Sequence, residues 1–128
     1  MARAAEGAGA DALTIANTYP AMCLDPSTRK SRIGSLTGGL SGPAIKPITL
    51  RLVHVASKAV KLPILGLGGI ENPDDILEYL LAGASAVQVG TANFVDPRAS
   101  ERLVDGLERR FSELSISRIS DIGGIPEA

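Results

Sequence analysis

The stretch from Leu62 to Thr91 reads LPILGLGGIENPDDILEYLLAGASAVQVGT and predicts a strand, a helix and a second strand. Leu62–Leu67 and Ser85–Gly90 are short, mainly apolar runs, as expected for buried strands. Between them, Asn72 is a good N-cap residue, and the proline after it suits the first helical position. Gly83 stands where a helix commonly ends in a left-handed residue. This order predicts two parallel strands joined by a right-handed crossover.

The helix between these strands has an amphipathic pattern. Its apolar stripe is expected to consist of Ile76, Leu77, Leu80 and Leu81. Asp74 and Asp75 fall in the first turn, where negative charge is favourable to the helix dipole. We therefore interpret them as stabilising acids and not as a catalytic pair.

The same alternation extends toward the N-terminus. Ala2–Ala8 is predicted to be a helix that ends at Gly9, and its start without a capping residue is typical of a segment cut from something longer. Asp11–Asn17 is predicted to be a buried strand. Pro47–Val60 is predicted to be an amphipathic helix whose buried stripe is Ile48, Leu52, Val55, Ala56 and Ala59.

Downstream, Asp96 and Pro97 repeat the cap-then-proline signal and predict another helix. Its buried side chains are expected to be Leu103, Leu107, Phe111 and Leu114. A short helical turn is expected around Ile116–Ile119. Three predicted strands alternating with helices indicate an α/β fold with parallel strands in chain order.

A long connection, Thr18–Ile45, separates the first strand from the following helix. Its flanks Ala21–Leu24 and Lys30–Ile33 can pair as a hairpin across an Asp-Pro-Ser turn. A loop of this length in a compact domain is usually functional or mobile. The small residues of Gly38–Gly42 fit a flexible loop and a ligand-contacting backbone equally well.

Composition excludes several classes of function. The chain has 128 residues, enough for one domain, and a net charge of −1 that shows no nucleic-acid footprint. No apolar run is long enough to span a membrane. One cysteine and one histidine make a metal site improbable, and the absence of a disulfide framework fits the cytoplasm. No nucleophile–base, metal-ligand or Walker pattern is present.

Candidate ligand contacts follow each predicted strand. Asn17-Thr18 ends the first, Gly68-Gly69 the second and Gly90-Thr91 the third. Ligands bind at this end of parallel strands, and successive barrel strands commonly share a phosphate site there. Either glycine pair alone is more typical of an ordinary turn, but together they favour a phosphate. Asn17 fits a buried polar residue as well as a ligand contact. His54 shares a charged helix face and is interpreted as a solvated surface residue, and Cys23 in the long loop is interpreted as a small apolar filler.

Four segments carry a family resemblance. ANTYPA (16–21), TGGLSGPAIKP (37–47), GLGGI (66–70) and VQVGTANF (87–94) resemble successive motifs of the class 1 dihydroorotate dehydrogenases, best the NAD-linked form. The resemblance covers roughly residues 2–114 and is expected to make residues 1–128 one partial domain, the C-terminal half of a (β/α)₈ barrel with strands six, seven and eight. The fumarate-linked form and the dihydropyrimidine dehydrogenases are weaker matches.

The resemblance implies FMN and the oxidation of dihydroorotate to orotate in pyrimidine biosynthesis. Asn17 and Thr18 match the pair that hydrogen-bonds the pyrimidine. Residues expected to contact FMN are Ala16 and Gly42 through the backbone, and Gly68, Gly69, Gly90 and Thr91 around the phosphate. An iron–sulfur/FAD electron-transfer subunit and a homo-oligomer are the implied partners.

The departures from the family pattern concern catalysis. The family's catalytic cysteine lies on a mobile loop before this segment, and Cys23 follows the Asn-Thr pair instead. A flavin-contacting lysine and several substrate asparagines are also expected upstream. We therefore expect the chain to be a fragment or truncated product that is inactive alone. The alternatives are a non-catalytic phosphate- or flavin-binding half-barrel and a related dihydropyrimidine dehydrogenase.

Overall fold

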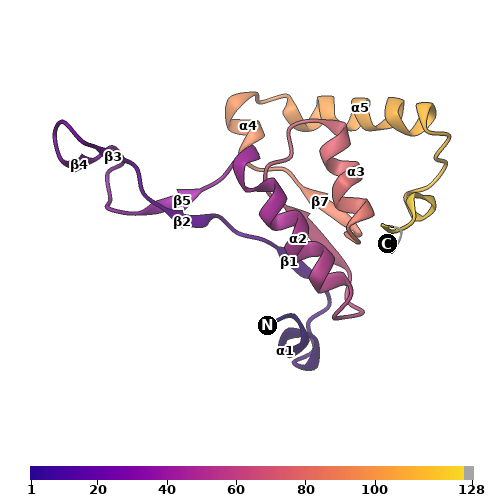
Figure 1. Ribbon diagram of the computed structural model, residues 1–128. Coiled ribbons are helices and arrows are strands. Elements are labelled where there is room, and N and C mark those ends of the chain that lie inside the picture. Colours follow the sequence, from indigo (N-terminus) through magenta and orange to yellow (C-terminus); the bar gives the residue numbers. More distant parts are fainter. Residues whose placement is uncertain (126–128) are drawn as a thin grey trace.

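The structure, a computed structural model, describes residues 1–125 and is built on a three-stranded sheet (Figure 1). Strands β1 (Leu13–Ile15), β6 (Ile64–Leu67) and β7 (Ala86–Gln88) lie in the order β1-β6-β7, and both pairings are parallel. The predicted topology is confirmed. All three strands are shorter than the predicted Asp11–Asn17, Leu62–Leu67 and Ser85–Gly90, and the β6–β7 ladder ends where Leu67 is level with Gln88.

Helices pack around this sheet (Figure 1). Helix α2 contacts β6, α3 contacts β7, and α5 packs on α3. The helical elements are α1 (Ala2–Gly7), η1 (Pro43–Ile45), α2 (Lys46–Ser57), α3 (Pro73–Leu81), α4 (Ala92–Val95), α5 (Ala99–Glu113) and η2 (Ile119–Ile122). Within residues 1–125, no helix is long and apolar enough to cross a membrane.

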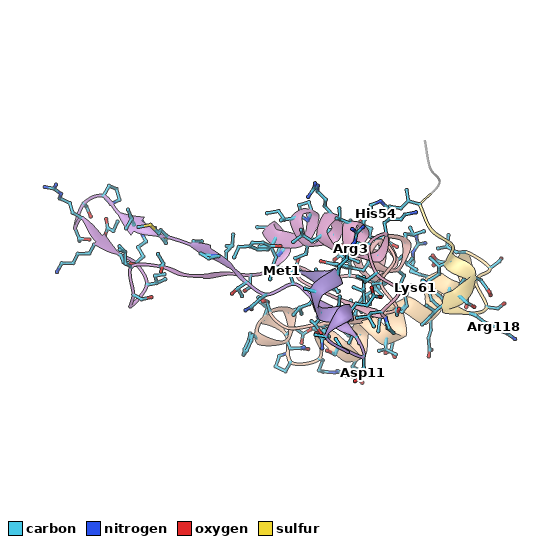
Figure 2. All side chains as sticks on the ribbon, turned by 90° about the horizontal axis from the view of Figure 1, so that it is seen from below. Met1, Arg3, Asp11, His54, Lys61 and Arg118 are labelled. Carbon is cyan, nitrogen blue, oxygen red and sulfur yellow. The ribbon has the colours of Figure 1, made fainter. Side chains whose placement is uncertain are left out.

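The long connection forms a two-part antiparallel arm that projects from the sheet (Figures 1 and 2). At its base, β2 (Tyr19–Ala21) pairs with β5 (Gly38–Leu40). At its tip, β3 (Leu24–Asp25) pairs with β4 (Lys30–Ser31). The predicted hairpin around the Asp-Pro-Ser turn is thus present, with a shorter ladder than expected. The second ladder contains Gly38–Leu40, a segment predicted to be either a flexible loop or a ligand-contacting backbone.

The buried face of α2 differs from the prediction. Its buried residues are Thr49, Val53 and Ala56, whereas Ile48 and Val55 are both 49% exposed. Ala56 is buried as predicted, but the buried face of the helix includes Thr49 and Val53 in place of Ile48 and Val55. The reason is Thr49, a polar residue that is fully buried because its hydroxyl is hydrogen-bonded inside the core.

Helix α3 begins and ends as predicted. The Asn72 side chain accepts a hydrogen bond from the backbone N–H of Asp75, which completes a capping box, and Gly83 has φ = +103° just after the helix. Its stripe is partly wrong, because Leu81 is exposed and Tyr79 is completely buried. The Tyr79 hydroxyl has hydrogen-bonding partners in the core, so burial of this polar group carries only a small free-energy penalty.

Helix α5 begins later than predicted. Asp96 does not cap it; its carboxylate accepts from the N–H of Arg98 in the turn before the helix. The buried side of α5 includes Leu103 and Gly106, while Leu114 is 48% exposed. Leu103 and Leu107 face the core as predicted, whereas Leu114 is the C-cap residue after the helix. A Cβ added to Gly106 would lie 2.5 Å from Pro73, so α5 crosses the start of α3 there. The expected turn at Ile116–Ile119 forms instead at Ile119–Ile122.

Candidate functional site

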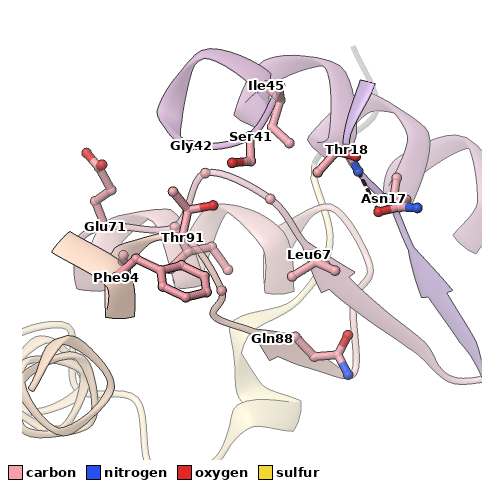
Figure 3. Close-up of a pocket in the computed structure, with 16 residues that line it drawn as sticks. Asn17, Thr18, Ser41, Gly42, Ile45, Leu67, Glu71, Gln88, Thr91 and Phe94 are labelled. Carbon is pink, nitrogen blue, oxygen red and sulfur yellow. Dashed lines mark hydrogen bonds between the residues drawn. The ribbon is translucent and has the colours of Figure 1, made fainter. Parts of the chain in front are cut away.

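A pocket of about 260 Å³ lies at the C-terminal ends of the three parallel strands (Figure 3). The end of each strand contributes to its wall, as does the turn that enters η1. All of the residues predicted from the sequence to contact a ligand line this pocket: Ala16, Asn17, Thr18, Gly42, Gly68, Gly69, Gly90 and Thr91. The fold therefore brings together positions that span 76 residues of chain, from Ala16 to Thr91 counted inclusively.

The turn after β6 depends on its two glycines. Gly68 has φ = +138° and Gly69 has φ = +70°, conformations that other residues rarely adopt. A Cβ on Gly69 would lie 2.8 Å from the carbonyl oxygen of Gly42 and 2.9 Å from the Cβ of Lys46. The turn is therefore pressed against the entry to α2, and only glycine fits there.

The turn after β7 is open instead of crowded. A Cβ added to Gly90 would have no neighbour within 4 Å, so the space beside this backbone is free for a ligand. Among the described residues, the backbone N–H groups of Gly69, Gly90 and Thr91 donate no hydrogen bond. Unpaired amides that line a concave site are suited to an anion.

Asn17 and Thr18 form the polar end of β1. The side-chain oxygen of Asn17 accepts a hydrogen bond from the N–H of Thr18 at 2.8 Å (Figure 3). This bond occupies the amide oxygen and leaves its NH₂ group able to donate. Thr18 packs against β5, since a Cβ on Gly39 would lie 2.3 Å from its hydroxyl. The contact with β5 at the base of the arm thus holds Thr18 next to Asn17 at the pocket.

The floor of the pocket is set by strand register. Leu67 of β6 is level with Gln88 of β7, and Ala16, one residue past the Ile15–Gly66 pair, is level with both. All three line the pocket, and Gln88 is the polar member of this layer. Sequence reasoning missed Gln88. Its position two residues before Gly90, on the same side of the strand in a period of two, is the signal that could have identified it.

The electrostatics of the pocket are unusual for an anion site. No lysine or arginine is among its lining residues in the described part of the chain, and Glu71 contributes a carboxylate at the rim. Figure 3 shows the Glu71 side chain directed away from Leu67 and Gln88. Binding of a phosphate here would therefore depend on backbone N–H groups instead of on ion pairs.

Behind the pocket, Asp75 organises the loop between β6 and α3. Its carboxylate is buried and accepts hydrogen bonds from the N–H groups of Glu71 and Asn72 and from the ammonium group of Lys46. Burial opposes ionisation of Asp75, but these bonds outweigh it and lower the pKa of the carboxyl. The hydrogen bond to Asp75 raises the pKa of Lys46. Asp75 is thus structural, as predicted, but through a buried network and not only through the helix dipole.

The other residues singled out from the sequence lie outside this pocket. Cys23 is exposed on the arm, so its interpretation as an apolar filler is wrong. His54 lies on α2 (Figure 2). Neither lines the pocket. Among residues 1–125, no group of histidine, cysteine, aspartate and glutamate side chains is arranged to hold a metal ion.

Comparison with known proteins agrees with the resemblance noted in the sequence. Residues 1–111 match the family profile described as Dihydroorotate dehydrogenase. The chain is 51% identical over 127 residues to the protein named "Dihydroorotate dehydrogenase B (NAD(+)), catalytic subunit" of Pelobacter propionicus, covering 99% of this chain and 42% of that one. It is 52% identical over 124 residues to the protein of the same name from Thermodesulfovibrio yellowstonii, covering 97% and 41%.

A solved structure shares the fold. The Eimeria tenella dihydroorotate dehydrogenase, crystallised in complex with ferulenol, aligns with a TM-score of 0.77 and 31% sequence identity, over 97% of this chain and 33% of that chain. The chain spans about two fifths of the curated relatives it matches. Its three parallel strands and their helices have the α/β fold of part of a (β/α)₈ barrel. The chain belongs to the dihydroorotate dehydrogenase family.

Proposed function

We propose that this chain is part of a longer enzyme that oxidises dihydroorotate to orotate with FMN, in the synthesis of pyrimidine nucleotides. The observation that carries the proposal is the single pocket into which the ends of β1, β6 and β7 converge. Family membership supplies the reaction class, and the pocket supplies groups of the required chemistry.

The residues of the pocket fit a flavin mononucleotide. The amides of Gly69, Gly90 and Thr91, with Gly68, would hold its phosphate, and the open space beside Gly90 is the volume that a side chain would fill. The backbone of Ala16 and Gly42 would contact the flavin. When bound, FMN supplies a two-electron acceptor for the hydride that leaves the substrate.

Asn17 and Thr18 would bind the pyrimidine. The free NH₂ group of Asn17 can donate to a ring carbonyl, and the Thr18 hydroxyl can donate or accept. A site whose polar groups pair with ring N–H and C=O groups discriminates against analogues that lack them, because the buried groups are then left unpaired. These two residues would therefore orient the substrate and not transfer its proton.

The proton acceptor is proposed to lie elsewhere in the enzyme. Cys23 is exposed on the arm and does not line the pocket, so it is not placed to remove a proton from a ligand there. General base catalysis typically contributes about 10²–10⁴-fold to a rate. We propose that a cysteine outside residues 1–128 performs this role, and that this chain alone is inactive.

The partner proposal rests on the names of the relatives. Proteins called catalytic subunits of an NAD(+)-linked enzyme act beside another subunit. We propose an electron-transfer subunit with FAD and an iron–sulfur cluster, a homo-oligomeric catalytic core, and a cytoplasmic location.

The test is substrate oxidation by the full-length protein that carries this sequence. Purified protein is supplied with FMN, a dye acceptor and either dihydroorotate or dihydrouracil, and product formation is followed. We expect orotate formation and little turnover of dihydrouracil. Preference for dihydrouracil would indicate a dihydropyrimidine dehydrogenase, and flavin binding without turnover of either substrate would indicate a non-catalytic flavin-binding protein.

A further inference from the structure

Tyr79 links the core to the pocket. It lies on α3, is fully buried, and is the largest of the fully buried side chains. Its hydroxyl oxygen lies 2.7 Å from the carbonyl oxygen of Gly68, the first residue of the turn that lines the pocket. The ring is held over β6 at Gly66, where an added Cβ would lie 2.4 Å from the ring atom Cδ1. The first glycine of the GLGG run thus makes room for Tyr79.

The proton positions in this contact follow from chemistry. A carbonyl oxygen only accepts, so Tyr79 donates its single proton to Gly68. The Thr49 hydroxyl lies 2.5 Å from the Tyr79 oxygen, and it also lies 3.1 Å and 3.0 Å from the carbonyl oxygens of Ile45 and Lys46. Burial raises the pKa of Tyr79, which keeps the phenol protonated at neutral pH.

The hydrogen bond from Tyr79 to the Gly68 carbonyl fixes an amide that faces the pocket. The Gly68–Gly69 peptide is trans, so the C=O of Gly68 and the N–H of Gly69 point in opposite directions. Since the carbonyl is held toward Tyr79 in the core, the Gly69 N–H points away from the core. Gly69 lines the pocket, and within residues 1–125 its N–H donates to nothing.

We propose that Tyr79 is a positioning residue for the phosphate of FMN, because its hydroxyl locks the Gly68–Gly69 peptide with the Gly69 N–H toward the pocket. The inference rests on the proposed function. The orientation of the Gly69 N–H matters more here than in a phosphate site that contains basic side chains, because no lysine or arginine lines this pocket in the described part of the chain. Two consecutive glycines have wide conformational freedom, so a peptide between them needs an external contact to hold its orientation.

The experiment compares two flavins that differ by the phosphate. The affinities of FMN and riboflavin are measured by flavin fluorescence quenching in the apo form of the full-length protein and its Tyr79→Phe variant. We expect FMN to bind about 3- to 10-fold more weakly to the variant, the range of one hydrogen bond, with riboflavin affinity unchanged. General loosening of the fold would weaken both flavins equally, so the ratio of the two affinities reports the phosphate alone.

Tyr19→Phe is the matched control. The Tyr19 hydroxyl is buried and has no hydrogen-bond partner among the described residues, so the same deletion should leave FMN affinity unchanged. Equal FMN affinity in the wild type and Tyr79→Phe would overturn this inference alone, as would a parallel loss of FMN and riboflavin. A wild-type protein that binds no FMN would overturn the proposed function, and this inference with it.

Discussion

The ammonium nitrogen of Lys46 lies 2.5 Å from a carboxylate oxygen of Asp75, and this ion pair joins the first turn of α2 to the first turn of α3. The other oxygen of Asp75 accepts from the N–H groups of Glu71 and Asn72, at 2.8 and 3.1 Å. The Cβ of Lys46 also touches the position that a Gly69 side chain would occupy. The Lys46–Asp75 ion pair thus supports the loop between β6 and α3, on the side of that loop away from the pocket.

Asp75→Asn should destabilise the full-length protein by about 1–3 kcal/mol, because it removes the more buried of the two charge partners of Lys46, the other being Glu78, and weakens the acceptor of two loop amides. Asp74→Asn is the control: it makes the same chemical change one residue earlier, at a side chain that is 61% exposed. An exposed pair such as Asp74 with Arg110 contributes at most about 1 kcal/mol. Equal losses in urea unfolding would show that the Lys46–Asp75 pair has no special role.

The lowered pKa of Asp75 predicts a pH dependence of stability. A carboxyl whose folded pKa is depressed stabilises the fold above its unfolded pKa, near the ordinary value of 3.8, and loses that contribution as pH falls through the folded value. The wild type should therefore keep its advantage over Asp75→Asn at about pH 6 and lose it progressively as the pH falls from about 5 to below 3.8. Unfolding free energies measured across this range test it. A difference that stayed constant to the lowest pH would contradict the assignment.

Asn17→Ala should raise the KM for dihydroorotate by about 10-fold, the effect of one lost hydrogen bond near the upper end of its range, and leave FMN content unchanged. The side chain lines the pocket, and within residues 1–125 its hydrogen bond is to the next residue alone, so its removal should not disturb the fold. Steady-state kinetics and the flavin absorbance of the purified variant are the measurements. Loss of flavin with an unchanged KM would show that Asn17 contacts the cofactor and not the substrate.

The sequence was sufficient to predict the order of the parallel strands and the residues that meet at their ends. Strand–helix alternation fixes parallel topology, and residues such as Asn17 and Gly90 stand at the strand ends whatever the details of packing. The same reasoning brings Asn17, Thr18 and the two glycine pairs to one end of the sheet without any side-chain geometry, whereas Ala16 and Gly42 were expected from the family resemblance.

The supporting contacts could not be predicted in this way because they depend on pairs distant in sequence. Thr49 and Tyr79 are 30 residues apart, and their hydroxyl groups meet in the core, where Tyr79 also donates to the carbonyl oxygen of Gly68. Hydrophobic periodicity ranks Ile48 and Leu81 above them, and both of those side chains are exposed. A second ladder, β2 with β5, was missed because a glycine-rich segment has little strand propensity of its own.

The isolated 128-residue chain should be inactive toward dihydroorotate and should self-associate. Phe94 is 92% exposed and Val95 is 82% exposed beside the pocket, and β1 and β7 each leave one edge unpaired among the described residues. Light scattering of the purified chain measures its size, and Phe94→Ser with Val95→Ser should raise the fraction of monomer. Turnover of dihydroorotate by a monodisperse monomer would show that the chain needs no further part.

The central claim, that the turns after β6 and β7 hold the phosphate of FMN, is tested most directly at Gly90. A substitution at Gly69 would also disturb Gly42 and Lys46, whereas a Cβ on Gly90 touches nothing, so Gly90→Val fills the pocket without disrupting contacts. Gly34→Val on the exposed arm, which likewise meets no neighbour, is the matched control. The measurement is the molar ratio of FMN to protein in the purified full-length wild type, Gly90→Val and Gly34→Val. Equal melting temperatures of the three proteins would show that each is folded. We predict a ratio near one for the wild type and Gly34→Val and a severalfold lower ratio for Gly90→Val; an unchanged ratio in Gly90→Val would contradict the account.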